Sequence, residues 1–253
     1  MKQTLRHNKI LELVKQQGYV STEQLVEELK VSSQTIRRDL NELAENHLIR
    51  RHHGGAATPS TTENSDYIDR KQFFSQQKSC IGQEVAKLIP HGSSLFIDIG
   101  TTPEAVAHAL LAHQNLRVVT NNLNAAYLLM QKEDFKITLA GGVLRTDGGI
   151  IGEATVEFIN QFRLDYCILG ISAVEADGSM MDYDYHEVQV KKALMRNARQ
   201  VILVTDHSKF SRNAIVRLGN IRDVDYIVTD NPLPLELSHH LSHSDVVVCV
   251  CGE

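Results

Sequence analysis

Short polar motifs follow several of the predicted strands in the C-terminal part of the chain. Gly100-Thr101-Thr102 brings backbone amides and hydroxyls to the start of a predicted helix, where unpaired N–H groups and the helix dipole favour a phosphate. Thr102 is expected to cap that helix, with Pro103 at its first position. Lys209 adds a positive charge, and the amides of Asn121-Asn122 can hold hydroxyl groups. These residue types favour a small phosphorylated ligand that carries hydroxyls.

The motifs also share one position in the expected fold. Ligands of open α/β sheets bind at the carboxyl ends of the strands, so motifs that follow different strands converge on one crevice. A single motif of this kind is more often a capped turn or a bend, and only the shared position favours a site. The sequence has no Walker A and no G-x-G-x-x-G pattern, which argues against ATP and dinucleotides. The residues assigned to the site on this ground are Asp98, Gly100, Thr101, Thr102, Thr120, Asn121, Asn122, Gly141, Gly142 and Lys209.

The N-terminal region carries residue types that read DNA. A predicted third helix turns Ile36, Leu40 and Leu43 towards a core, so its opposite face presents polar and basic side chains. Arg and Gln make bidentate contacts with base edges in the major groove, and basic residues on a hairpin reach the backbone or the minor groove. The residues assigned to DNA contact are Ser33, Gln34, Thr35, Arg37, Arg38, Asn41, Arg50, Arg51, His52, His53 and Gly54. Periodicity alone leaves open a three-helix interaction domain with a solvated basic face.

Three short helices and a hairpin must position these side chains. The pattern predicts a helix over residues 5–16, a second that begins after Ser21 and a third that begins after Ser32. Residues 48–52 are predicted as a strand that turns back through the glycines at 54 and 55. Helix, turn, helix and hairpin together make the layout of a winged helix-turn-helix.

Beyond about residue 75, strand patterns alternate with helix patterns, which predicts a parallel or mostly parallel sheet covered by helices. The predicted strands are Ser94–Asp98, Arg117–Thr120, Ile137–Ala140, Tyr166–Leu169, Val201–Thr205, Tyr226–Thr229 and Val246–Val250. The predicted helices cover roughly 79–89, 103–112, 122–131 and 187–198. We therefore predict an α/β protein with a winged helix-turn-helix at 1–57, a small polar linker at 58–74 and a sensing and oligomerisation domain at 75–253.

Charge is unevenly distributed along the 253 residues. The net charge of −5 argues weakly against a nucleic-acid binder, but residues 1–57 carry nine Lys/Arg against seven Asp/Glu, and the remainder carries 17 against 24. No stretch approaches the ~18 consecutive apolar residues of a membrane span. The N-terminal residues lack the apolar region of an export signal, and the cysteines fit reduced thiols, so we expect a cytoplasmic protein.

The N-terminal motifs resemble a known DNA-binding family. Val20–Leu43 and residues 51–56 are similar to the DeoR-type helix-turn-helix through Val31-Ser32, the run Thr35–Leu40 and the closing residues 53–56. The resemblance implies that this region binds double-stranded operator DNA.

Residues from about Arg70 to Lys209 resemble the DeoR C-terminal sensor domain, whose fold is similar to that of ribose-5-phosphate isomerase. The resemblance adds Glu187 and Lys191 to the effector site. Leu169–Ala173 stands where such isomerases have an aspartate-rich segment, so the carboxylate expected to transfer a proton is missing. We therefore expect a sensor with no catalytic residue, not an enzyme.

Three stretches of this domain, 97–108, 148–155 and 184–188, are similar to the branch of the family that regulates glycerol 3-phosphate metabolism, as is the N-terminal stretch 13–23. This resemblance implies sn-glycerol 3-phosphate as effector, repression of glycerol catabolism genes and a homo-oligomer, as a tetramer. It implies no cofactor, and we expect no metal and no membrane contact. Two alternatives stay open: a sugar-phosphate isomerase with an accessory head, and a DNA-bound activator built from the same parts.

Overall fold

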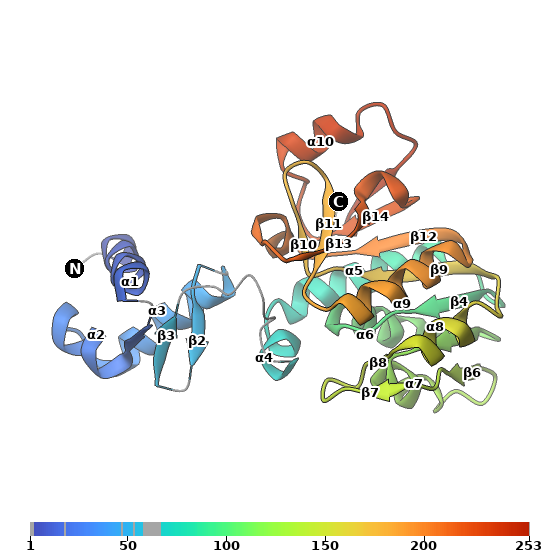
Figure 1. Cartoon of the computed structure of the whole chain (residues 1–253), viewed down its shortest axis with the longest axis horizontal. Helices are drawn as coiled ribbons and strands as arrows, with labels where there is room; N and C mark the ends of the chain where they lie inside the picture. The colour runs from blue at the N-terminus through green and yellow to red at the C-terminus, as the bar shows by residue number, and fades with distance from the viewer. Residues whose placement is uncertain (1–2, 18, 47, 53, 58–66, 253) are drawn as a thin grey trace. The chain divides into compact units, whose positions relative to one another are not determined.

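The computed structural model of the protein describes residues 3–17, 19–46, 48–52, 54–57 and 67–252 (Figure 1). The chain divides into two compact units, Met1–Ser65 and Asp66–Glu253. Residues 58–66 of the predicted linker at 58–74 lie outside the described residues. The rest of that segment contains a helix. Tyr67–Gln72 forms helix α4, whose last turn carries Arg70 and Lys71, where cations favour a helix end.

The first unit contains α1 (Gln3–Gln17), α2 (Thr22–Leu29) and α3 (Ser33–Glu45). Serine caps begin the last two helices as predicted, because the hydroxyl of Ser21 accepts from the Gln24 amide at 3.1 Å and that of Ser32 accepts from the Thr35 amide at 3.2 Å. The helices bury one apolar cluster. Its fully or nearly fully buried members are Ile10, Leu13, Val14, Val20, Leu25, Leu29, Ile36, Leu40, Leu43, Ala44, Ile49 and Ala56.

The wing of this unit has one strand more than the predicted hairpin. Strand β3 (Gly55–Ala57) pairs antiparallel with β2 (Arg50–His52) on one side and with β1 (Tyr19–Ser21) on the other. Gly55 permits this close pairing, because a Cβ there would lie 2.2 Å from the carbonyl oxygen of Val20. Strand β1 is short and lies between two helices, so its sequence shows no alternation of apolar and polar residues that would predict a strand.

The second unit is built on a seven-stranded parallel sheet, in which every strand corresponds to one predicted from the sequence. The strand order is β15-β14-β12-β9-β4-β5-β6, and each neighbouring pair is parallel. The strands are β4 (Ser94–Ile97), β5 (Arg117–Thr120), β6 (Lys136–Leu139), β9 (Leu164–Gly170), β12 (Ala198–Val204), β14 (Tyr226–Thr229) and β15 (Val247–Val250).

Helices cover both faces of the sheet, because successive apolar side chains of each strand point to opposite faces and both faces must be buried. One apolar cluster joins one face to α5 (Ser75–Leu88), α6 (Thr101–Ala109) and α7 (Leu123–Leu129). A second joins the other face to α8 (Glu153–Ile159), α9 (Tyr185–Arg196) and α10 (Leu235–Leu241). Single turns of 3₁₀ helix occur at Leu110–Ala112, His207–Ser211 and Ile221–Asp223.

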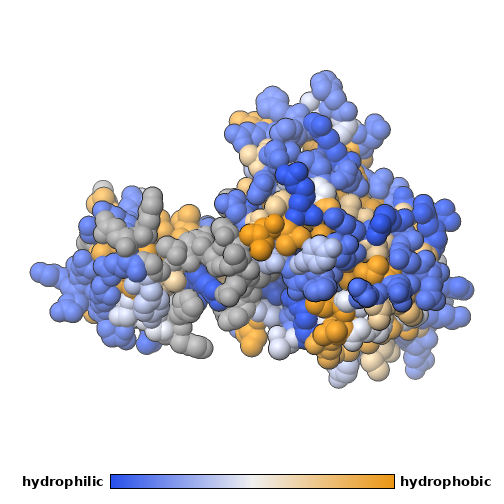
Figure 2. Space-filling view, viewed as in Figure 1, coloured by the Kyte–Doolittle hydropathy of each residue, from blue (hydrophilic) through white to orange (hydrophobic). Residues whose placement is uncertain are grey.

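Two smaller pieces of sheet were not predicted. Strand β11 (Ser179–Asp182) pairs antiparallel with β10 (Ala173–Val174) and with β13 (Val216–Asn220), and β7 (Val143–Leu144) pairs with β8 (Ile150–Ile151). Most of these strands are too short for a periodic pattern. Within the described residues no helix is both long and apolar enough to cross a membrane. The face shown in Figure 2 is largely hydrophilic with smaller hydrophobic patches.

Candidate DNA-binding surface and effector site

Helix α3 exposes the face that the sequence assigns to base reading. Its side chains at Ser33, Gln34, Arg37, Arg38 and Asn41 are exposed, and Thr35 is half-buried beside the Ser32 cap. The opposite face packs Ile36, Leu40 and Leu43 into the core. On the wing, Gly54 is exposed, and half-buried Arg51 donates to the carbonyl of Arg37 at 3.4 Å. Half-buried Arg50 shares strand β2 with Arg51; the His52 side chain and all of His53 lie outside what is described.

Asp39 interrupts the basic sequence of α3 but does not reach its outer face. The side chain is 1% exposed, and both Arg6 Nε and Arg6 Nη2 donate to its carboxylate, the latter at 2.8 Å. His7 Nε2 lies 3.2 Å from the same carboxylate. Burial would raise the pKa of Asp39, but its bonds to Arg6 and His7 outweigh burial and hold the pKa below its usual range. The acidic residue is therefore internal, and α3 presents Arg37 and Arg38 without it.

The Gly100-Thr101-Thr102 turn directly follows β4 and begins α6, but its geometry differs from the prediction. Gly100 is the N-cap residue, with a φ of 126°, so the helix begins at Thr101 and not after Thr102. Proline at 103 is tolerated in the first turn because its missing N–H would have had no partner within the helix. Thr101 and Thr102 keep their backbone N–H groups in that turn, which suits an anion.

At the end of β5, Thr120, Asn121 and Asn122 are all buried, but they differ in what their side chains do. The Thr120 hydroxyl donates to Ile97 O at 2.6 Å and accepts from the Asn122 amide, and Asn122 caps α7 and donates to Asp98 O. Both side chains are thus occupied by the fold. Asn121 Nδ2 donates to Ile150 O, whereas its Oδ1 is buried and receives no hydrogen bond from any described residue.

Lys191 of α9 gathers three carboxylates beneath the turn. Its ammonium lies 2.5 Å from Asp182, 2.8 Å from Glu187 and 3.6 Å from Asp98. Burial would lower the pKa of Lys191, but these anions outweigh it and raise the pKa well above its ordinary value. Burial would raise the pKa of Glu187, but Lys191 and Arg145 together bring it to about 2.

Asp98 is a fully buried carboxylate of this cluster. Burial raises its pKa to about 7, because the attraction of Lys191 only partly compensates the cost of a buried charge. Its Oδ2 accepts from the Gly170 amide at 3.2 Å, and its Oδ1 receives no hydrogen bond from the described residues. Asp98 Oδ1 and Asn121 Oδ1 are thus buried acceptors at neighbouring strand ends, which suits donors such as ligand hydroxyls.

Asp182 shows that one sequence interpretation was incomplete. The segment Leu169–Ala173 lacks an acid, but Asp182 from β11 brings a carboxylate to the cluster and to Ser172. A carboxylate is therefore present in space although it is absent from the expected segment. The pairing of β11 with β13 places it there.

Positive side chains gather around Asp206. Lys209 is half-buried, and its pKa lies well below the ordinary value because of burial and the neighbouring cations Arg212, Lys78 and Arg70. Burial lowers the pKa of Lys78 to about 8, although Asp206 partly offsets the loss. Mutual repulsion of this kind is relieved by a bound anion.

Lys78, Arg70 and Arg212 were not among the predicted site residues. A signal for Lys78 existed: it stands at the spacing of the buried positions Ile81, Gly82 and Val85 of α5, and a lysine in that phase is unusual unless paired.

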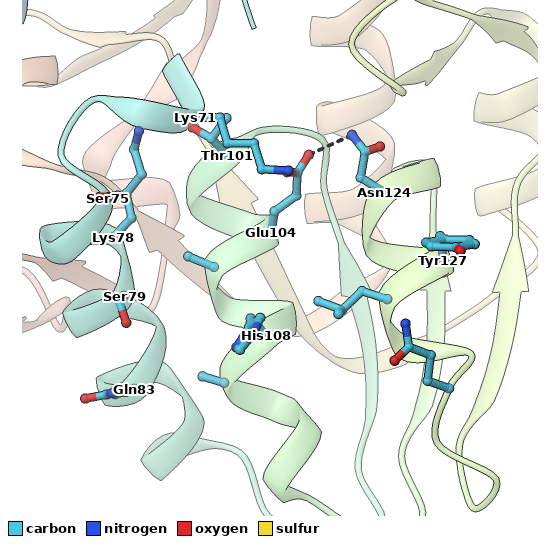
Figure 3. A pocket seen from close by; sticks show the side chains of 14 residues that line it. Lys71, Ser75, Lys78, Ser79, Gln83, Thr101, Glu104, His108, Asn124 and Tyr127 are labelled. Atoms are coloured by element: carbon cyan, nitrogen blue, oxygen red, sulfur yellow. Dashed lines mark hydrogen bonds between the residues drawn. The ribbon is translucent and has the colours of Figure 1, made fainter. Parts of the chain in front are cut away.

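A cavity of about 580 Å³ opens beside the turn between α5, α6 and α7 (Figure 3). Thr101, Glu104 and His108 lie along α6 at its floor, with α5 residues on one side and α7 residues on the other. Gly141-Gly142 is placed differently: Gly142 has a φ of 150° and packs so closely on Thr155 that a Cβ would lie 2.1 Å from its hydroxyl. This close packing explains why residue 142 is a glycine. No group of three or more His, Cys, Asp or Glu suited to a metal occurs in the described part of the chain.

Two domain families match the chain. The DeoR-like helix-turn-helix domain matches residues 6–62, and the DeoR C terminal sensor domain matches residues 74–231. One match lies in each of the two units described above.

Relatives match over nearly the whole length. The glycerol-3-phosphate regulon repressor of Haemophilus influenzae is 67% identical over 100% of this chain and 98% of that protein. The protein of the same name from Escherichia coli is 62% identical over 99% of this chain and 100% of that protein. The HTH-type transcriptional repressor CsqR of Escherichia coli is 40% identical over 98% of this chain and 95% of that protein.

Among solved structures, ribose 5-phosphate isomerase A from Neisseria gonorrhoeae aligns with a TM-score of 0.40 and 15% identity, over 53% of each chain. This is a distant likeness. The three relatives above are named as transcriptional repressors, and the chain is a regulator, not an enzyme. The two domain matches and the end-to-end identity confirm the family expected from the sequence: the chain belongs to the DeoR family of DNA-binding transcriptional regulators.

Proposed function

We propose that this regulator represses genes of glycerol 3-phosphate metabolism and is released from its operator by sn-glycerol 3-phosphate. The observation that carries the proposal is the 67% identity, over the whole chain, to a protein named glycerol-3-phosphate regulon repressor. The alignment spans both the helix-turn-helix unit and the sensor unit.

The effector is placed with its phosphate at Gly100-Thr101-Thr102 and its hydroxyls towards the centre of the sheet. Backbone N–H groups at the start of α6 support the phosphate. Burial and neighbouring cations lower the pKa of Lys209, and a bound anion favours its charged form. The buried acceptors Asp98 Oδ1 and Asn121 Oδ1 support the hydroxyls. The molecule has no need of a cofactor, because binding alone shifts the equilibrium between DNA-bound and free states.

We further propose a cytoplasmic homo-oligomer, a tetramer, that places pairs of winged heads on adjacent half-sites. Two-fold related heads match half-sites one helical turn apart, so an effector that alters their spacing weakens binding. Sedimentation of the purified protein with and without operator DNA measures the assembly directly.

The proposal is tested by titrating labelled operator complexes with sn-glycerol 3-phosphate and, as the matched control, with glycerol. Release by the phosphate ester and not by glycerol is expected, because glycerol leaves the anion site unfilled. A thermal-shift panel of phosphorylated polyols and sugars provides the binding readout, and a true ligand at 100 times its Kd adds about 2.7 kcal/mol. Equal release by glycerol, or no stabilisation by glycerol 3-phosphate, contradicts the proposal.

A further inference from the structure

Helix α4 is fastened by its side chains to elements that border the anion site. The Tyr67 hydroxyl donates to Glu104 Oε2 at 2.7 Å and accepts from Asn124 Nδ2 at 3.0 Å. Arg70 Nη2 lies 3.4 Å from Asp147. Glu104 stands in the first turn of α6, so α4 is tied to the same helix start that is offered to the phosphate.

Lys78 provides the closest link between α4 and the site. Its side chain is 5% exposed, and its ammonium donates to Phe73 O at 2.6 Å and to Arg70 O, which caps the C-terminal end of α4. The same lysine lines the cavity that Thr101 and Glu104 line (Figure 3). One lysine therefore binds carbonyls at the C-terminal end of α4 and also lines the cavity beside the Gly100-Thr101-Thr102 turn.

Two kinds of acceptor compete for that ammonium. The carbonyls of α4 are neutral, whereas a phosphate carries full charge, and hydrogen bonds between charged partners are roughly twice as strong as neutral ones. The burial that lowers the pKa of Lys78 also makes an anion the better partner, because an anion restores the charged form.

We propose that Lys78 couples the anion site to α4: an anion at the Gly100-Thr101-Thr102 turn draws the ammonium away from the carbonyls of Arg70 and Phe73, and α4 loosens from its sites on α6 and α7. The inference rests on the proposed function for the identity of the anion. Helix α4 is the first described element after the winged head along the chain, so it is the part of the sensor unit nearest to the head in sequence.

A second set of contacts carries the same change. Arg70 contacts Asp147, Asp147 lies 2.8 Å from Arg145, and Arg145 lies 2.7 Å from Glu187. Glu187 in turn pairs with Lys191, which faces Asp98 at the strand end. Ligand hydroxyls bound at Asp98 thus also act on α4, through this series of ion pairs that ends at Arg70.

Hydrogen exchange of the full-length protein, followed by mass spectrometry on the peptide that contains Tyr67–Gln72, tests the coupling. Saturating sn-glycerol 3-phosphate should speed exchange in α4, and inorganic phosphate at millimolar concentration should do so in part. Loss of a hydrogen bond to a charged group corresponds to about tenfold or more in an opening equilibrium, which sets the expected change. Unchanged or slower exchange with both anions overturns the inference.

Tyr67→Phe tests the attachment of α4 without changing the residues of the proposed anion site, because it removes only the hydroxyl that bonds to Glu104 and Asn124. The variant should show faster exchange in α4 without ligand and should release operator at about tenfold lower glycerol 3-phosphate. Tyr185→Phe is the matched control, since Tyr185 is 61% exposed and phenylalanine keeps its ring contact with His186. Wild-type behaviour of Tyr67→Phe overturns the inference.

Lys78→Met removes the shared ammonium and keeps the apolar stem. Exchange in α4 should be fast in this variant and insensitive to either anion, whereas Lys78→Arg should restore part of the response. If wild type is not released by glycerol 3-phosphate but inorganic phosphate still speeds exchange in α4, the proposed function fails and the coupling stands. If release occurs while α4 exchange stays constant in wild type, the coupling fails and the proposed function stands.

Discussion

Replacement of Asp39 by alanine should destabilise the head and leave effector binding intact. Asp39 and Arg6 are 1% and 8% exposed, and the carboxylate receives two hydrogen bonds from the guanidinium. Removing one partner of such a buried pair leaves an uncompensated charge and costs about 3–5 kcal/mol. We expect a loss of about 3 kcal/mol, because part of the Arg6 side chain reaches solvent. A domain of this size has roughly 5–15 kcal/mol in total, so the loss is a large fraction.

The assay is hydrogen exchange of α1 and α3 in the full-length chain, together with operator binding by fluorescence anisotropy. Exchange in both helices should accelerate by roughly the factor of 100 or more that 3 kcal/mol represents. Stabilisation by glycerol 3-phosphate should persist, since the ligand site lies in the other unit. The pKa of Asp39 is lowered in the folded state, so its contribution is present above the unfolded pKa and is lost as the pH falls through the folded value.

Two control variants make the interpretation specific. Glu12→Gln removes a carboxylate from the exposed pair with Lys9 and should cost no more than about 1 kcal/mol. The double change Arg6→Met with Asp39→Leu removes both charges and should recover most of the stability. Wild-type exchange in the Asp39→Ala head, or a double variant no better than the single one, would refute the reasoning.

Three further predictions concern binding and chemistry. Arg38→Ala should cost about 1–3 kcal/mol on operator and relax preference at one position, whereas Arg51→Ala should weaken all sequences alike and flatten the salt slope by about one unit, both measured by anisotropy across salt. Equal loss on operator and random DNA for Arg38→Ala would contradict base reading. Thr101→Val and Lys209→Met should bind operator normally but resist release by glycerol 3-phosphate; release at the wild-type concentration would place the phosphate elsewhere. Incubation with ribose 5-phosphate should yield no ketose, and turnover on the order of 1–10³ per second would overturn the sensor assignment.

Much of the fold follows from local pattern. The strands β4, β5, β6, β9, β12, β14 and β15 were all predicted because buried parallel strands are short continuous apolar runs bounded by turns. Elements that depend on distant partners were missed. Strand β1 exists through pairing with β3, and β11 exists through pairing with β13. Helix α4 lies in a segment read as linker from the composition of its first residues.

The sequence identified polar residues at the strand ends, but not what each side chain does there. The rule that ligands lie at strand ends brought out Asp98 and Asn121, whose buried oxygens receive no hydrogen bond from described residues. The same rule selected Thr120 and Asn122, whose hydrogen bonds hold the turn together. Only the three-dimensional structure distinguishes the two kinds of residue, because both are small, polar and follow a strand. Asp182 and Lys78 reach the site from elements that no strand-end pattern includes.

The strand order of the sheet has a consequence for synthesis on the ribosome. Of the sheet strands β4 is made first, but it ends up between β5 and β9, and β9 emerges only after β5, β6 and the helices α6, α7 and α8. Until then the half-sheet β4-β5-β6 exposes the unpaired, apolar edge of β4, a state that favours aggregation. Chains truncated between β6 and β9 should therefore be insoluble even though they contain the complete winged head, and chains that extend through β12 should recover. The head is made before any strand of this sheet, so such truncated chains would carry all of residues 1–65 together with an unfinished sheet.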